Sequence, residues 1–268
     1  MVSSNYDAEI YDIFHSTSFM GDIEFYVAEA QEAGGPVLEL GAGTGRIAFA
    51  IAQGGVSVTA LEFDPGMLSR MRHRREEASE AIRRRLACVQ GDMRDFRLDE
   101  RFERVFIPFR AFNHNLERDH QLACLRCVRE HLAPGGKLLL NTFHPSLDFM
   151  GRNSGPLEGV WRLVDERELA DGSRILRSEA NRYDTVRQLV HSRHRFERFA
   201  ENGRLVEVHL QVLDMTYFYP SQLREVLLEA GFADATVYGG FHRGPLEHDQ
   251  DELVVEATAP TYSAHRLR

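Results

Sequence analysis

A glycine-rich turn with the sequence Glu39-Leu40-Gly41-Ala42-Gly43-Thr44-Gly45 stands between a short apolar run and a helical pattern. The apolar run, residues 37–40, predicts a strand, and residues 45–53 predict the helix that follows it. Closely spaced glycines allow a tight turn and leave bare backbone against which a ligand can lie, because no Cβ intervenes. A strand, a glycine turn and a helix in this order are typical of a parallel α/β sheet, so this feature constrains the fold more than any other.

The order of strand and helix repeats after the turn. Apolar runs at 56–61, 86–90, 105–107 and 137–141 predict four more strands, and the helix before the last of them is expected at about 117–132. This alternation is the sequence form of a parallel sheet that carries helices on both faces.

A different periodicity follows, because hydrophobicity alternates with a period of two from about 159 to 217. This pattern predicts three or four antiparallel strands, and Asp171-Gly172 and Asn202-Gly203 are typical of hairpin turns. Helical periodicity returns at 221–230, where Ser221 is the expected N-cap. Two closing strands of the main sheet are then predicted at 235–238 and 252–257.

The fold class predicted from these segments is α/β: a Rossmann-like, doubly wound, mostly parallel seven-stranded sheet with an inserted antiparallel β-sheet. Its expected parts are an N-terminal helical lid segment at 1–34, a ligand-binding Rossmann-like domain formed by 35–145 and 218–260, and an inserted antiparallel lid or oligomerisation segment at 146–217. We expect the insertion to roof the substrate cavity, and a homodimer through the inserted sheet is one assembly that this arrangement allows.

Composition limits the partners and the compartment. The chain has 41 acidic and 32 basic residues and a net charge of -9, which disfavours a nucleic-acid partner because like charges repel. No apolar run approaches the roughly 20 residues that span a bilayer, the first residues lack a signal-peptide pattern, and three cysteines do not suggest a disulfide framework. We therefore expect a cytoplasmic protein with no membrane partner.

Acidic residues follow the predicted strands at positions that suit a nucleoside. Glu62 ends the second strand 17 residues after Gly45, where a carboxylate can accept hydrogen bonds from ribose hydroxyls, and Asp64 is a second candidate or a helix cap. Asp92, in Gly91-Asp92-Met93, follows the third strand and can receive an adenine amino group. Glu39 stands before the glycine turn, where a carboxylate favours a cationic ligand over a pyrophosphate.

Three elements follow one another on successive strand ends: the glycine turn, Glu62 and Gly91-Asp92-Met93. In this order they resemble the class I S-adenosylmethionine-dependent methyltransferase family over roughly residues 35–145. The resemblance implies S-adenosylmethionine as cofactor and S-adenosylhomocysteine as product, with the glycines along the methionine part, Glu62 at the ribose and Asp92 with Met93 at the adenine. The expected cofactor-binding residues are Tyr11, Glu39, Gly41, Ala42, Gly43, Thr44, Gly45, Glu62, Phe63, Asp64, Met67, Gly91, Asp92, Met93 and Phe109.

Two further residues resemble small-molecule, aminosugar-type N-methyltransferases of this family. Tyr11 resembles a lid tyrosine that closes over the cofactor, and His114 resembles a histidine of the equivalent loop. His114 is the main candidate general base, since an imidazole accepts a proton near neutral pH, and His144 is a second candidate. Tyr11 and His114 are therefore the expected catalytic residues.

No metal site is expected. Cys124 and Cys127 lack a second cysteine pair and lie in a helix with an apolar face, which favours buried thiols. His191 and His194 differ by an odd number on an expected strand and so point to opposite faces, which disfavours a metal site shared with His209.

The function favoured by the sequence is methyl transfer to a nitrogen of a small-molecule acceptor. A small-molecule O-methyltransferase, or a protein of this fold that binds S-adenosylmethionine without transferring methyl, remains an alternative. The aromatic residues of the insertion are expected to contribute to an apolar acceptor pocket; they are Trp161, Tyr183, Phe196, Tyr217, Phe218 and Tyr219.

Overall fold

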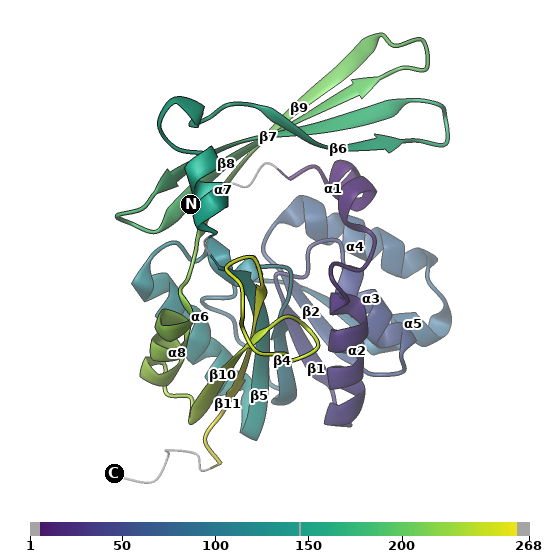
Figure 1. Cartoon of the computed structure of the whole chain (residues 1–268). Coiled ribbons are helices and arrows are strands. Elements are labelled where there is room, and N and C mark those ends of the chain that lie inside the picture. Colours follow the sequence, from purple (N-terminus) through teal and green to yellow (C-terminus); the bar gives the residue numbers. More distant parts are fainter. Residues whose placement is uncertain (1–5, 145, 262–268) are drawn as a thin grey trace.

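A seven-stranded sheet with the strand order β10-β11-β5-β4-β1-β2-β3 is the centre of the computed structural model, which describes residues 6–144 and 146–261 (Figure 1). Its strands are β1 (Val37–Leu40), β2 (Val58–Glu62), β3 (Leu86–Gln90), β4 (Phe102–Ile107), β5 (Leu132–Phe143), β10 (Asp234–Gly239) and β11 (Glu252–Thr258). The first five strands pair in parallel, whereas β11 is antiparallel to both of its neighbours. The strand order reverses beside β1, and ligands of open α/β sheets bind at such a reversal.

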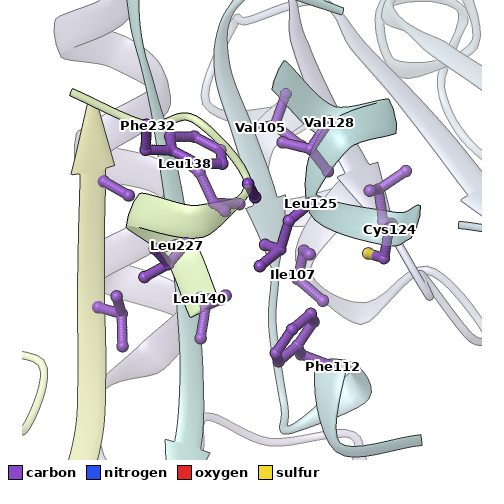
Figure 2. Close-up of a cluster of buried hydrophobic side chains, with 14 of the residues drawn as sticks. Val105, Ile107, Phe112, Cys124, Leu125, Val128, Leu138, Leu140, Leu227 and Phe232 are labelled. Atoms are coloured by element: carbon purple, nitrogen blue, oxygen red, sulfur yellow. The ribbon is translucent and has the colours of Figure 1, made fainter. Parts of the chain in front are cut away.

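Helices cover both faces of this sheet, as alternation along β4 requires. Val105 and Ile107 face α6 (Arg118–His131) and α8 (Pro220–Glu229) in one apolar cluster (Figure 2). Phe106 faces α2 (Asp22–Ala33) and α3 (Arg46–Gln53) in a second cluster with Tyr26 and Ile51. The helices are α1 (Ala8–His15), α2 (Asp22–Ala33), α3 (Arg46–Gln53), α4 (Pro65–Glu77), α5 (Glu80–Arg85), α6 (Arg118–His131), α7 (Leu147–Arg152) and α8 (Pro220–Glu229), with short 3-10 helices η1 (Ala111–His114) and η2 (Gly155–Leu157). None of the described helices is both long and apolar enough to cross a membrane.

A second sheet of four antiparallel strands lies across the carboxyl edge of the main sheet (Figure 1). Its strands, in this spatial order, are β6 (Arg162–Glu168), β7 (Arg174–Asp184), β8 (Leu189–Phe199) and β9 (Leu205–Thr216). Gly172 and Gly203 have positive φ in the two hairpin turns expected at these positions. Phe14 of α1 packs against Ile175 and Phe196, so the N-terminal helix is fixed to the underside of the inserted sheet.

The predicted fold class is confirmed, and the differences concern the ends of elements. β5 begins at Leu132 and runs through the glycine pair that we expected to precede it, because the backbone oxygen of Gly136 accepts a hydrogen bond from the amide of Ala259 at 2.8 Å. The predicted N-cap Ser221 is wrong. The helix begins one residue earlier, at Pro220, since proline suits the first helical position and Gln222 Oε1 accepts the amide of Tyr219 at 3.1 Å.

Candidate functional site

A cavity of about 1290 Å³ lies between the carboxyl edge of the main sheet and the inserted sheet. Its walls come from the N-terminal segment, the glycine turn, the loops after β2, β3, β4 and β5, and the inner face of β7 to β9. Pockets for a single drug-sized ligand usually measure about 300 to 1,000 Å³, so this cavity has room for a cofactor and an acceptor together.

Most of the predicted site residues meet at this cavity. The structure places twelve of them in its wall: Tyr11, Gly41, Gly43, Glu62, Phe63, Asp64, Met67, Gly91, Asp92, Met93, Phe109 and His114. Glu39, Ala42, Thr44 and Gly45 belong to the same turn but stand behind the wall.

The glycine turn is held by hydrogen bonds to the end of β2. The amides of Gly41 and Ala42 both donate to the backbone oxygen of Leu61, at 2.9 and 3.1 Å. Gly41 has a φ of +67°, and a Cβ at this position would stand 2.8 Å from the Cβ of Ala111. Glycine is therefore required at position 41 both by backbone conformation and by the close approach of the loop after β4.

Glu39 is a buried carboxylate with an unused oxygen. Its side chain is 2% exposed, and Oε2 has no hydrogen-bond partner in the described part of the chain. Burial raises the pKa of Glu39 to about 8, against the opposing charge of Arg46 and with a further contribution from Glu62. An unpaired acceptor of this kind beside the turn fits a ligand that carries an ammonium or sulfonium group.

Glu62 and Asp64 have different tasks at the end of β2. Glu62 Oε2 accepts the amide of Gly43 at 2.7 Å and Oε1 accepts the amide of Asp64 at 2.8 Å, while burial raises its pKa. Asp64 caps α4 through the amides of Gly66 and Met67. The carboxylate of Glu62 thus fixes the turn and still faces the cavity, as a ribose-binding residue must, whereas Asp64 acts as the helix cap.

The segment after β3 holds Asp92 in a fixed position. Arg94 donates to its carboxylate through Nε at 2.8 Å and through Nη2 at 2.5 Å, and the amide of Arg94 donates as well at 2.9 Å. Asn115 Nδ2 donates to the sulfur of Met93 at 3.3 Å. Half-exposed Phe63 lines the same cavity, so the wall offers one carboxylate, one thioether and one aromatic ring, which are side chains that suit a planar purine.

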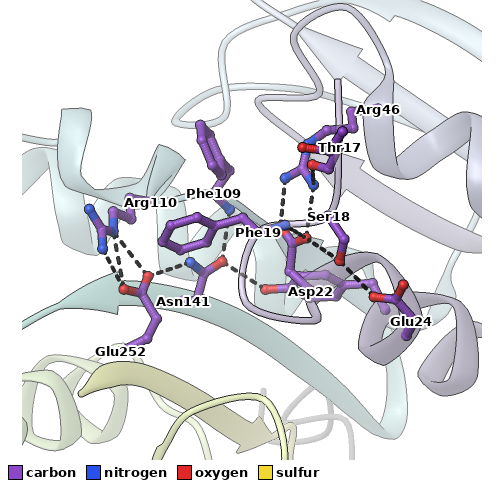
Figure 3. A network of polar contacts seen from close by, with 11 residues as sticks. Thr17, Ser18, Phe19, Asp22, Glu24, Arg46, Phe109, Arg110, Asn141 and Glu252 are labelled. Atoms are coloured by element: carbon purple, nitrogen blue, oxygen red, sulfur yellow. Dashed lines mark hydrogen bonds and ion pairs between the residues drawn. The ribbon is translucent and has the colours of Figure 1, made fainter. Parts of the chain in front are cut away.

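A buried ion pair connects the lid segment to the glycine turn (Figure 3). Arg46, the first residue of α3, contacts Asp22 through Nη1 at 2.8 Å and Nη2 at 2.5 Å, and it donates to the backbone oxygen of Thr17 at 3.2 Å. The guanidinium also lies 4.9 Å from the centre of the Phe109 ring. This contact brings the N-terminal segment against the loop after β4.

The loop after β4 has two consecutive residues in the left-handed region, Phe109 with φ +51° and Arg110 with φ +63°. The amide of Phe109 donates to Asn141 Oδ1 at 2.7 Å, and Arg110 contacts Glu252 at 2.6 Å. Asn141 Nδ2 donates to Glu252 Oε1 at 2.6 Å, which closes the network shown in Figure 3. Strained backbone of this kind persists only where its surroundings fix it, and it is common at binding sites.

His114 ends η1 and presents its ring to the cavity. Nε2 lies 3.3 Å from the hydroxyl of Tyr6, and the ring is also hydrogen-bonded to the backbone of Asp214. Burial by surrounding residues lowers the pKa of His114, against the bond to Asp214, so the imidazole is neutral near pH 7 and can accept a proton. His144 also lines the cavity, and its Nδ1 has no partner in the described residues.

Tyr11 lies against the glycine turn, where its ring and hydroxyl are both 3.9 Å from the position that a Cβ on Gly43 would take. Its ring meets those of Tyr6, His15 and Phe109 at centroid distances of 6.0, 4.8 and 6.4 Å. The tyrosine therefore stands over the turn, and its role as a lid residue stays a prediction.

The prediction for the aromatic residues of the insertion is correct only in part. Tyr183 and Phe196 line the cavity. Tyr217 and Phe218 are buried outside its wall, and Phe218 stacks on Phe112 in the core of the main domain. Trp161 and Tyr219 are also outside the wall, and Trp161 instead packs under the guanidinium of Arg195 at 4.9 Å.

The cysteines and the other histidines are arranged as expected from their spacing. Cys124 and Cys127 are buried free thiols. His194 lines the cavity, whereas His191 is outside its wall and contacts Asp214 at 2.7 Å. Within the described ranges, no group of three histidine, cysteine or acidic residues is arranged to hold a metal ion.

Sequence reasoning missed the residues that act through long-range contacts. Asn141 and Glu252 are fully or almost fully buried polar residues inside apolar strands, and this placement was the available signal. Asp22 and Tyr6 carried no such signal, because nothing near them in sequence indicates that they approach Arg46 and His114.

Comparison with known proteins finds a family match for part of the chain. Residues 37–136 match the family described as a methyltransferase domain, and this part of the chain is similar to it. The predicted family resemblance is confirmed, and solved structures of this fold hold S-adenosylmethionine, in agreement with the predicted cofactor.

Individual relatives of the methyltransferase domain share parts of the chain. The cypemycin N-terminal methyltransferase of a Streptomyces species is 33% identical over 113 residues, which are 42% of this chain and 44% of that protein. The dTDP-3-amino-3,4,6-trideoxy-alpha-D-glucopyranose N,N-dimethyltransferase of Streptomyces venezuelae is 28% identical over 143 residues, 50% of this chain and 55% of that protein. The matches thus span about half of these curated relatives.

A solved structure matches nearly the whole chain, including the inserted sheet. The CcbJ methyltransferase from Streptomyces caelestis superposes with a TM-score of 0.76 at 26% sequence identity, over 94% of this chain and 96% of that one. The arrangement of the methyltransferase domain and the roof above it is therefore shared with a known enzyme.

The raised pKa of Glu39 makes a prediction about cofactor affinity. Below about pH 8 this carboxyl is protonated in the free protein, and a bound cation requires its ionised form, so binding releases a proton. We expect the affinity for S-adenosylmethionine to rise with pH by up to about tenfold per unit between about pH 6 and pH 8, and to level off above. Isothermal titration calorimetry across this range measures it.

The matched variant is Glu39→Gln, which keeps the size and removes the titrating group. Because the pH dependence of the cofactor's own groups is common to both proteins, the difference between them isolates Glu39. We expect a flatter profile in the variant. If the affinity for S-adenosylmethionine depended on pH in the same way in the wild type and in folded Glu39→Gln, Glu39 would not exchange a proton on binding.

Proposed function

We propose that this protein is an S-adenosylmethionine-dependent methyltransferase that transfers a methyl group to a nitrogen of a small-molecule acceptor. The observation that carries the proposal is His114, a neutral imidazole that faces the same cavity as the glycine turn and Glu62. The relatives named above are N-methyltransferases of a peptide N-terminus and of an aminosugar, which supports nitrogen as the acceptor atom.

Different residues of the cavity would bind the cofactor, exclude water and accept the proton. Glu39 would attract the cationic part of S-adenosylmethionine from behind the glycine turn, and Glu62 would hold the ribose. The sulfonium of the bound cofactor supplies an electrophilic methyl group. Tyr11 would cover the turn and exclude water. His114 would orient the acceptor amine and take up its proton as the new nitrogen–carbon bond forms, which is the role that a neutral imidazole suits near pH 7.

The alternatives give different products. An O-methyltransferase would use the same base on a hydroxyl, and a protein that only binds the cofactor would give no methylated product. Nucleic acid is disfavoured as acceptor by the acidic wall of the cavity. We further propose a cytoplasmic location, where the three free thiols stay reduced.

A transfer assay tests the proposal. Incubation with methyl-labelled S-adenosylmethionine and separate panels of aminosugars, short peptides and hydroxylated compounds is expected to label an amine, with mass spectrometry locating the methyl on nitrogen. Labelling only of hydroxyl oxygens would replace the proposal by O-methylation. Cofactor binding without any labelled product across all panels would leave only the binding role.

The role of His114 predicts a specific kinetic defect. In His114→Ala, kcat is expected to fall about 10² fold or more at pH 7, since a general base usually contributes about 10² to 10⁴ fold. The dissociation constant of S-adenosylmethionine should change less than about twofold. The control is His73→Ala, an exposed histidine of α4 outside the cavity. An unchanged kcat in His114→Ala would remove the base from the mechanism.

We also propose a homodimer formed through the inserted sheet. The outer face of its edge strand β9 exposes apolar side chains at alternate positions, with Val208 and Leu210 at 49% and 57% exposure. Edge strands with apolar rows tend to pair, and a second copy offers the same row in a symmetric contact.

Sedimentation tests the dimer, because the chain mass is 30.6 kDa. We expect twice this mass for the wild type and the single mass for Leu210→Lys, which places a charge in the row. Leu228→Lys, at an exposed leucine of α8, is the control and should remain dimeric. A wild type that sediments as a monomer would contradict the interface.

A further inference from the structure

Three polar residues form a straight row across the inner face of the inserted sheet. Glu179 of β7 pairs in register with His194 of β8, and His194 pairs in register with Gln211 of β9. Directly paired residues of adjacent strands point to the same face. All three side chains line the cavity. The row therefore presents a carboxylate, an imidazole and an amide to whatever lies beneath the roof.

Gln211 is the member whose hydrogen-bonding capacity is unused. Its side chain is 6% exposed and lines the cavity, yet its amide forms no hydrogen bond with any other described residue. The polar atoms of Gln211 are not among the fully buried, unpartnered atoms of the described residues, so they remain open to the cavity. An unpaired amide in this position is available to a ligand, which can form the hydrogen bonds that the protein leaves unmade.

The neighbours of the row fix its protonation state. Burial lowers the pKa of His194, so the ring is neutral, and Ser192 Oγ lies 2.8 Å from its Nε2. Burial opposes the ionisation of Glu179, but the ion pair and hydrogen bond with Arg177 hold its pKa below the usual range. Glu179 is thus an anion, while His194 and Gln211 offer neutral donors and acceptors.

The charge of the whole cavity wall is negative. It contains eleven carboxylates: Asp7, Glu62, Asp64, Asp92, Glu117, Asp148, Glu179, Asp214, Asp249, Asp251 and Glu252. It contains five arginines, each already in an ion pair: Arg94 with Asp92, Arg110 with Glu252, Arg152 with Asp148, Arg167 with Asp165, and Arg177 with Glu179. The pKa values of His15, His114 and His194 are lowered, first of all by burial, so these rings add no positive charge near pH 7.

We propose that the acceptor binds at two places, with its reacting amine at His114 and a further amino or hydroxyl group at the row Glu179–His194–Gln211. The acceptor is then a cationic amine without a diphosphate. The inference rests on the proposed function and names its substrate class. A diphosphate would meet no unpaired arginine among the described residues of this wall and would be repelled by their carboxylates. An ammonium group would be attracted, and Gln211 would supply its missing hydrogen bonds to a hydroxyl or amine.

A matched pair of acceptors tests the charge preference. One aminosugar is offered as its methyl glycoside and as its thymidine-diphosphate ester, with labelled S-adenosylmethionine. We expect KM to be at least about tenfold lower for the methyl glycoside and to rise with added NaCl, because salt screens the attraction. An equal or lower KM for the diphosphate ester would overturn the substrate class while leaving the proposed function intact. No transfer to either compound would also overturn this substrate class, and the panel assay described above then decides the proposed function separately.

The attachment row is tested by Gln211→Leu. This variant buries a group of similar size without unpaired polar atoms, so the melting temperature should be equal or higher. We expect KM for the methyl glycoside to rise about tenfold with kcat unchanged within about twofold. Gln211→Glu, which restores an acceptor, should recover the affinity. A KM that stays within about twofold in folded Gln211→Leu would overturn the role of the row.

Two controls separate attachment from general effects on the sheet. Gln53→Leu makes the same replacement at the exposed end of α3, outside the cavity. Glu168→Gln removes an exposed carboxylate from β6 of the same sheet, also outside the cavity wall. Both should keep the wild-type KM, and an equal rise of KM in either control would show that the effect of Gln211→Leu is not specific to the row.

Discussion

The buried carboxylate of Glu252 is the contact on which the site depends. It begins the last strand of the sheet, and it is 2% exposed while it binds both Arg110 and Asn141. A buried charge is stable only when it is paired, and removal of one partner of such a group usually costs about 3 to 5 kcal/mol. The same carboxylate accepts a hydrogen bond from Asn141 and so orients the Asn141 oxygen that accepts the amide of Phe109. The last strand of the sheet therefore holds the strained loop after β4 in place.

This arrangement explains why the end of the chain matters for a site built near its beginning. The match to the methyltransferase domain ends at residue 136, before both Asn141 and Glu252. The loop after β4 belongs to the matched segment, but its conformation is imposed by residues outside it. The same holds for Asp22, which precedes the matched segment and pairs with Arg46 inside it. The matched segment is therefore completed by contacts from both flanks of the chain.

Whether a feature could be predicted from the sequence depends on how far apart in the chain its interacting residues are. The glycine turn, the acidic residue at the end of β2 and the hairpin glycines were predictable because their signals are local in sequence. The paired buried polar groups, such as Asn141 with Glu252, were not, since they join residues 111 positions apart. The row of Glu179, His194 and Gln211 also required the register of two hairpins, which hydrophobic alternation alone does not determine.

Strand β9 carries two surfaces at alternate positions. Val208 and Leu210 face outward, while His209 and Gln211 face the cavity. Point substitutions can therefore alter acceptor choice and assembly independently, since each residue belongs to one surface. The insertion or deletion of a single residue that is not taken up by a bulge, as the irregularity between Leu205 and Glu207 is, would exchange the two surfaces, because every side chain beyond it would turn to the other face. We conclude that this strand tolerates divergence in side chains but not in length.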